Sequence, residues 1–95
     1  METNSKWLGK ILFNEKYRLT SKDKLVASYL LFLPKDGIYL RSPRNYPSLA
    51  HAISAYSGLA VRTVQKSLGR LVGIGAVAFV TDVHLILEEV EWENI

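Results

Sequence analysis

The chain contains no cysteine among its 95 residues. Disulfide bonds and thiolate metal sites are therefore excluded, and a reducing compartment is the expected setting. Long apolar runs are missing as well, since no stretch approaches the roughly 20 residues that a membrane-spanning helix requires. The opening stretch METNSKWLGKILF has neither a sustained apolar segment nor a small-residue cleavage site. We therefore interpret it as part of the mature protein.

Basic residues are missing from the C-terminal quarter of the chain, where none lies beyond Arg70. Residues 1–87 hold all twelve lysines and arginines but only five of the nine acidic residues, which gives this segment a net charge of +7. Residues 88–95 hold the other four acids and carry a net charge of −4. A basic body suits a polyanionic partner such as nucleic acid, although ordinary solvated lysines would give the same count.

Sequence patterns typical of catalysis are also missing. The chain has no Ser-His-Asp arrangement, no pair of carboxylates in an apolar setting and no glycine loop of the kind that cradles phosphate. His51 and His84 lie far apart, and no acidic cluster joins them at metal-ligand spacing. We therefore expect no enzyme activity, no cofactor and no metal, and we look for function in a binding surface.

The length fits a single domain, which we divide into an N-terminal arm (1–19), a core (20–87) and an acidic tail (88–95). The apolar residues of the arm are spaced so that a short helix is allowed between residues 5 and 18. We expect this arm to pack either on the body of the protein or on a second copy. A homodimer contact of this kind would use the apolar side chains Trp7, Leu8, Ile11, Leu12 and Phe13. Trp92 in the tail either adds to such an interface or folds over the core.

A helix is predicted over residues 20–33. Thr20 is suited to cap its first amides, and Asp23 stands three residues later, where its carboxylate can reach back to complete a capping box. Pro34 ends the helix, because proline disfavours helical backbone at the residue before it. The wide apolar face that we expect to be buried consists of Leu25, Val26, Tyr29, Leu30, Phe32 and Leu33.

The middle of the chain reads as a turn at 34–37, a short strand at 38–40 and a loop at 41–48. Ser48 then caps a helix over residues 49–56. A tight turn follows at Ser57-Gly58, because glycine readily takes the left-handed conformation that redirects a chain after a helix.

A second helix is predicted over residues 61–72, followed by two β-rich runs at 76–80 and 83–87. The connection between these runs is only Thr81-Asp82, which indicates a β-hairpin. In the helix, Leu59, Val64, Leu68 and Leu71 share one face, and Arg62, Gln65, Lys66 and Arg70 fall mostly on the outside. Such an outer face suits the major groove of DNA.

The stretch SGLAVRTVQKSLGRL resembles the winged helix-turn-helix superfamily of bacterial, plasmid and phage DNA-binding proteins. The resemblance covers roughly residues 20–87 and rests on Ser54, Gly58-Leu59, Thr63-Val64-Gln65, Leu68 with Leu71, and Gly73 or Gly75. It implies an α+β fold of three or four helices with a C-terminal β-hairpin wing. It also implies double-stranded DNA as the partner and a cytoplasmic or nucleoid location in a prokaryotic cell. Two departures stand out: Ala60 occupies the usual Ser or Thr cap position, and the wing carries no Lys or Arg.

A weaker resemblance covers residues 12–31, LFNEKYRLTSKDKLVASYLL, which is similar to the start of plasmid replication-initiator N-terminal domains. The matching pairs are Leu12-Phe13, Lys16-Tyr17, Leu19-Thr20 and Lys24-Leu25. This resemblance implies a protein that reads repeats beside a replication origin.

The candidate DNA contacts fall into two groups. Arg62, Gln65 and Lys66 are the predicted base-edge readers, since Arg pairs with guanine and Gln with adenine. Val61, Thr63 and Arg70 complete the helix expected in the groove, and Ser67 is expected to present a surface or phosphate-binding hydroxyl. Arg41, Arg44 and Asn45 form a loop that either binds phosphates or is an ordinary exposed loop.

We therefore expect sequence-specific binding of duplex DNA by a small transcriptional or plasmid/phage maintenance regulator. One alternative is a replication-initiator, centromere-binding or origin-binding domain. Another is a winged-helix protein–protein interaction module without DNA binding, which the absence of Lys and Arg from the wing and the missing cap favour. Fold alone cannot separate these functions.

Overall fold

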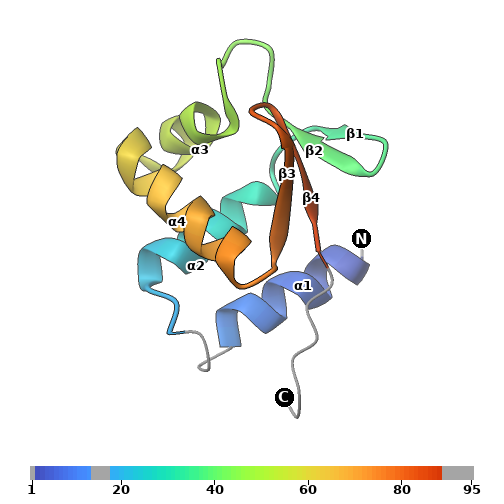
Figure 1. The fold of residues 1–95 in the computed structure, drawn as a ribbon, viewed down its shortest axis with the longest axis vertical. Coiled ribbons are helices and arrows are strands. Elements are labelled where there is room, and N and C mark those ends of the chain that lie inside the picture. Colours follow the sequence, from blue (N-terminus) through green and yellow to red (C-terminus); the bar gives the residue numbers. More distant parts are fainter. Residues whose placement is uncertain (1, 14–17, 89–95) are drawn as a thin grey trace.

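The computed structural model describes residues 2–13 and 18–88, with side chains from residue 6 onward. Within these ranges the chain is α+β (Figure 1). The helices are α1 (Glu2–Phe13), α2 (Ser21–Leu30), α3 (Leu49–Ser57) and α4 (Val61–Gly73). The strands are β1 (Lys35–Asp36), β2 (Tyr39–Arg41), β3 (Val77–Thr81) and β4 (His84–Leu87). The predicted fold class is confirmed at this level, and the element order is compatible with a winged helix-turn-helix.

The four strands of the described residues form one antiparallel sheet in the order β1-β2-β4-β3. Strand β2 pairs with β4, so that Leu40 stands opposite Leu85 and the middle of the chain is tied to its end. Figure 1 shows α2, α3 and α4 grouped on one side of the sheet, with α1 running past the end of the hairpin. The core lies where these helices meet the sheet, and Ile53, Leu71 and Leu85 are completely buried in it.

Helix α2 begins as its sequence predicts. The Thr20 hydroxyl accepts a hydrogen bond from the Asp23 amide at 3.1 Å, and the Asp23 carboxylate accepts one from the Thr20 amide at 3.0 Å. The helix ends at Leu30, three residues before the predicted end. Its buried face is also narrower than predicted, because Leu25 and Phe32 are exposed. Phe32 lies beyond the end of the helix, between Leu31, which packs on the core, and the buried Leu33.

The connection between β1 and β2 differs from the prediction. We expected a turn at 34–37 and a strand at 38–40, but Lys35 and Asp36 pair with Leu40 and Tyr39 to form a short hairpin. Gly37, with φ of 66°, supplies the left-handed backbone that this reversal requires. The turn therefore lies one step later in the chain than the proline suggests, and it leaves Ile38 exposed.

Helices α3 and α4 are joined by the predicted tight turn. Gly58 has φ of 79°, and its amide donates to the Ser54 carbonyl at 2.9 Å, which closes α3. The Ser54 hydroxyl also donates to the carbonyl of Leu59, so it ties the two sides of the turn together. Helix α4 starts after Ala60 without a side-chain cap, as the sequence predicts.

The β3–β4 hairpin turns one residue later than predicted. Thr81 pairs with His84 after a bulge, so that the turn is made by Asp82 and Val83. The tip is fixed to the rest of the protein by two backbone hydrogen bonds. The Ser42 amide donates to the Val83 carbonyl at 2.7 Å, and the Leu49 amide donates to the Asp82 carbonyl at 3.2 Å. The hairpin tip is therefore held against the start of α3.

The arm packs on the body of the protein, which is one of its two predicted placements, and the predicted dimer contact is wrong for Trp7 and Ile11. Trp7 is 6% exposed and Ile11 is 0% exposed, and both belong to the protein's own core. The Trp7 indole Nε1 donates to the Ala76 carbonyl at 2.9 Å, which satisfies its polar atom inside the protein. Leu8 and Leu12 are half-buried, and Phe13 is exposed. Helix α1 is thus part of the core that we had confined to 20–87, because a small domain has few other apolar groups to cover its hairpin.

Candidate nucleic-acid interface

The outer face of α4 carries the three predicted base readers. Arg62, Gln65 and Lys66 are all exposed, and the helical repeat of 3.6 residues places them on the side opposite the buried Val64, Leu68 and Leu71. No acidic residue occurs anywhere in the helix sequence VRTVQKSLGRLVG. The predicted polar face of α4 is therefore present as a cationic, hydrogen-bonding surface.

The other predicted residues of α4 lie differently. Val61 is half-buried and packs against the core, so it fixes the start of the helix. Thr63 is half-buried on the side of α4 that faces α2. Ser67, expected as a surface hydroxyl, is 1% exposed, and that prediction is wrong.

Arg70 is held by a buried carboxylate rather than projecting freely. Its Nη1 donates to Asp23 Oδ1 at 2.9 Å, and the Ser67 hydroxyl donates to the same oxygen at 2.7 Å. The Asp23 side chain is fully buried, whereas the Arg70 side chain is 53% exposed. The ion pair commits one edge of the guanidinium, and Arg has five N–H donors in all. The prediction that Arg70 lies outside is therefore only half right.

The electrostatics of Asp23 follow from this network. Burial by itself would raise the pKa of the Asp23 carboxyl. The hydrogen bonds from the Thr20 amide, the Ser67 hydroxyl and the Arg70 guanidinium outweigh burial and hold the pKa below its ordinary value. Asp23 is thus an ionised carboxylate whose charge is matched inside the protein.

The predicted phosphate-binding loop is only partly exposed. Arg44 and Asn45 are exposed in the loop before α3. Arg41 is half-buried in β2, and its amide donates to the Pro34 carbonyl at 2.9 Å. Figure 1 shows the loop at the same end of the molecule as the start of α4, with α3 between them. Arg44 and Asn45 are therefore the members of the predicted loop that are open to solvent, and Arg41 is less accessible.

The hairpin adds no lysine or arginine to this surface. His84 Nε2 lies 3.3 Å from Asp36 Oδ2, and its Nδ1 lies 3.2 Å from the Thr81 hydroxyl, so both ring nitrogens have partners within the protein. His51, on α3, is exposed, and its Nδ1 lies 2.7 Å from the Ser48 hydroxyl. Neither histidine has a metal-site setting. Within the described ranges, no three His, Cys, Asp or Glu side chains are grouped to hold a metal ion.

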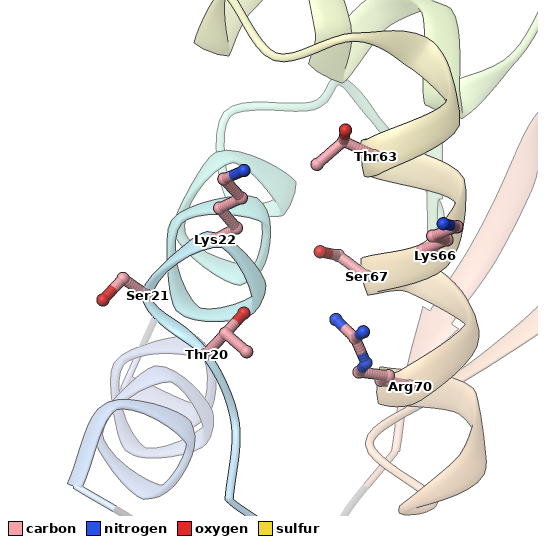
Figure 2. Close-up of a pocket in the computed structure, with 7 residues that line it drawn as sticks. All are labelled: Thr20, Ser21, Lys22, Thr63, Lys66, Ser67 and Arg70. Atoms are coloured by element: carbon pink, nitrogen blue, oxygen red, sulfur yellow. The ribbon is translucent and has the colours of Figure 1, made fainter.

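A hollow of about 520 Å³ lies between α2 and α4 (Figure 2). Its lining is Thr20, Ser21, Lys22, Thr63, Lys66, Ser67 and Arg70. Lys22 was not among the predicted contacts, because its position beside α4 depends on how α2 packs against α4. The capping pattern at Thr20 predicts where α2 begins, but it does not predict which helix lies next to that end.

None of the helices in residues 2–13 and 18–88 is long and apolar enough to cross a membrane. No known protein family, curated protein or solved structure matches this chain. The exposed Arg62, Gln65 and Lys66 of α4 are therefore the features of this chain that point to a function.

Proposed function

We propose that this chain binds duplex DNA, with α4 in the major groove and the loop before α3 on the phosphate backbone. The observation that carries the proposal is the outer face of α4, where Arg62, Gln65 and Lys66 are exposed on a helix without an acidic residue. Arg and Gln offer paired donors and acceptors that match the major-groove edges of guanine and adenine. Lys66 and Arg44 supply the positive charge that phosphates attract.

The order of the elements supports a winged helix-turn-helix as the finer fold. Helices α3 and α4 meet at the left-handed Gly58, the β3–β4 hairpin follows α4, and β2 pairs with that hairpin. This is the chain order that the resemblance in SGLAVRTVQKSLGRL implies. The role that goes with it is a prokaryotic regulator of transcription or of plasmid or phage maintenance. A replication-initiator or origin-binding role is the alternative from the second resemblance.

The proposal is tested by the salt dependence of duplex binding, measured by fluorescence anisotropy with a labelled duplex. If the protein neutralises about five phosphates, log K falls against log salt concentration with a slope near about −4 to −5. A slope near zero on duplexes of any sequence would contradict the proposal. Selection of bound fragments then separates the two roles: inverted repeats indicate a dimeric regulator, and tandem direct repeats indicate origin or centromere binding.

A protein-interaction module is the second candidate, and a specific observation favours it. Phe79 and Val80 on β3 are exposed, and the β3–β4 hairpin has no Lys or Arg. Exposed apolar groups of this size are typical of protein contacts when they lie together. Absence of duplex binding at low salt, with binding to a partner that Phe79→Ser abolishes, would favour this function.

A further inference from the structure

The hollow between α2 and α4 has an unusual lining, because every residue that lines it has either a hydroxyl or a cationic side chain. In Figure 2, Thr63, Ser67 and Arg70 point from α4 toward α2, Thr20 points toward Arg70, and the Lys22 side chain extends along α2. Lys66 stands at the edge and points away from the space between the helices. Hydroxyl and cationic groups from the start of α2 and from α4 therefore line one volume.

The Asp23 carboxylate beside the hollow already accepts three hydrogen bonds. Asp23 Oδ1 accepts from Ser67 and Arg70, and Oδ2 accepts from the Thr20 amide. Arg70 matches its charge. Lys22 forms no ion pair with any residue that the structure describes, and neither does Lys66. The hollow therefore keeps an excess of positive charge, and Arg70 keeps N–H donors beyond the one given to Asp23.

We propose that this hollow binds one phosphate group, with Lys22 and Arg70 as its charged partners and the Thr63 hydroxyl as a further donor. A phosphate has several acceptor oxygens pointing in different directions, and it suits donors that approach from two sides. Arg is adapted to phosphate because its guanidinium presents parallel donors, and the ion pair with Asp23 holds it in place before the ligand arrives.

The phosphate has two sources, a nucleic-acid backbone or a free phosphate compound. The backbone source rests on the proposed function: with α4 in a groove, Lys22 on the neighbouring α2 would meet the strand that borders the groove. Lys22 then adds an anchor from outside the recognition helix, which fixes how α4 is oriented but reads no sequence.

The first test needs no DNA. Sodium phosphate is titrated into the ¹⁵N-labelled full chain at constant ionic strength, with sodium chloride as the reference salt. The expected result is a saturable shift of the amides of residues 20–22 and 63–70, lost in Lys22→Ala and weakened in Thr63→Val. Lys35→Ala is the matched control, since it removes an exposed lysine from β1 and should leave the titration unchanged.

The second test measures duplex affinity for the same variants. Lys22→Ala should weaken binding on the order of tenfold on any sequence and make the salt slope shallower by about 0.9, the loss of one phosphate contact. Lys35→Ala should do neither. Phosphate shifts without any duplex binding would support the site with a free phosphate compound while the proposed function fails. Duplex binding that Lys22→Ala and Lys35→Ala leave equal, with no phosphate shifts in the hollow, would overturn the site and leave the proposed function standing.

Discussion

Helix α4 and the β3–β4 hairpin follow one another in the chain, yet their surfaces are opposites. Helix α4 exposes Arg62, Gln65 and Lys66 and contains no acid. The hairpin has no lysine or arginine, exposes Phe79 and Val80, and has its tip bonded through backbone groups to the start of α3. Under the proposed function, the difference separates binding from support: α4 would contact DNA, and the hairpin would serve only to complete the sheet on which the helices pack.

The largest expected effect comes from removing Trp7 of α1, which contacts the backbone between α4 and β3. Trp7→Ala removes a buried indole and its hydrogen bond to the Ala76 carbonyl. It should lower the free energy of unfolding by about 3–5 kcal/mol, the usual range for buried aromatic-to-alanine changes. Urea unfolding followed by circular dichroism measures this loss.

The matched control for Trp7 is Phe13→Ala, on the same helix but 81% exposed, which should change stability by less than about 0.5 kcal/mol. Analytical ultracentrifugation of both variants tests whether Trp7 or Phe13 contributes to a dimer contact. If Trp7→Ala were as stable as Phe13→Ala and merely turned a dimer into a monomer, the assignment of Trp7 to the core would be wrong.

The next effect concerns the helix side of the comparison. Arg62→Ala and Gln65→Ala should each weaken binding to the preferred duplex by about 1–3 kcal/mol and change binding to random duplex little. Arg44→Ala, in the exposed loop, should weaken both duplexes about equally, because a phosphate contact carries no sequence information. Competition anisotropy with the two duplexes measures the ratio. Equal behaviour of all three variants would contradict the division into base readers and backbone contacts.

A smaller effect concerns the ion pair beneath α4. Because the folded pKa of Asp23 is lowered, its contribution to stability is present above the unfolded value of about 3.9 and is lost as the pH falls through the folded pKa. Asp23→Asn should lower the free energy of unfolding at pH 7 by about 1–2 kcal/mol, a range that is discounted for the exposure of Arg70. It should also reduce the amount by which the free energy of unfolding falls on acidification. Urea unfolding at neutral and acid pH checks this, with Asp82→Asn as control. An equal acid dependence in Asp23→Asn and the unmodified chain would remove Asp23 as its source.

Local signals in the sequence predicted the local parts of this structure. The Thr20 and Asp23 capping box, the Gly58 turn and the apolar stripe of α4 each involve residues within a few positions of one another. The β3–β4 hairpin and the exposed position of Arg62, Gln65 and Lys66 followed from the same kind of evidence. Short-range patterns succeed because helix caps, turns and amphipathic faces are determined by neighbours.

Long-range partners escaped the sequence analysis for the complementary reason. Asp23 meets Arg70 across 47 positions, and the Trp7 indole finds a backbone carbonyl 69 positions away. Neither pairing has a spacing rule, because each depends on how finished helices pack. The incomplete prediction for Arg70 has the same cause. Helical periodicity indicates that Arg70 lies on the outer side of α4, but it does not indicate that Asp23 on α2 lies close enough to form an ion pair.

The smallest expected effect is at the hairpin tip. Asp82 is exposed, but its carbonyl accepts from the Leu49 amide, so the tip is held in place whatever side chain stands there. Asp82→Lys places a cation on that tip without disturbing the backbone bond. If the hairpin reached a phosphate, the new charge would make the salt slope steeper by about 0.9 and raise affinity. We expect no change of slope and less than about a twofold change in affinity at 0.15 M salt, where the Debye length is about 8 Å. Lys66→Ala in the same assay should make the slope shallower, since its charge lies on the face that we propose meets DNA. A steeper slope for Asp82→Lys would show that the hairpin, too, is part of the binding surface, and the separation of binding from support would fail.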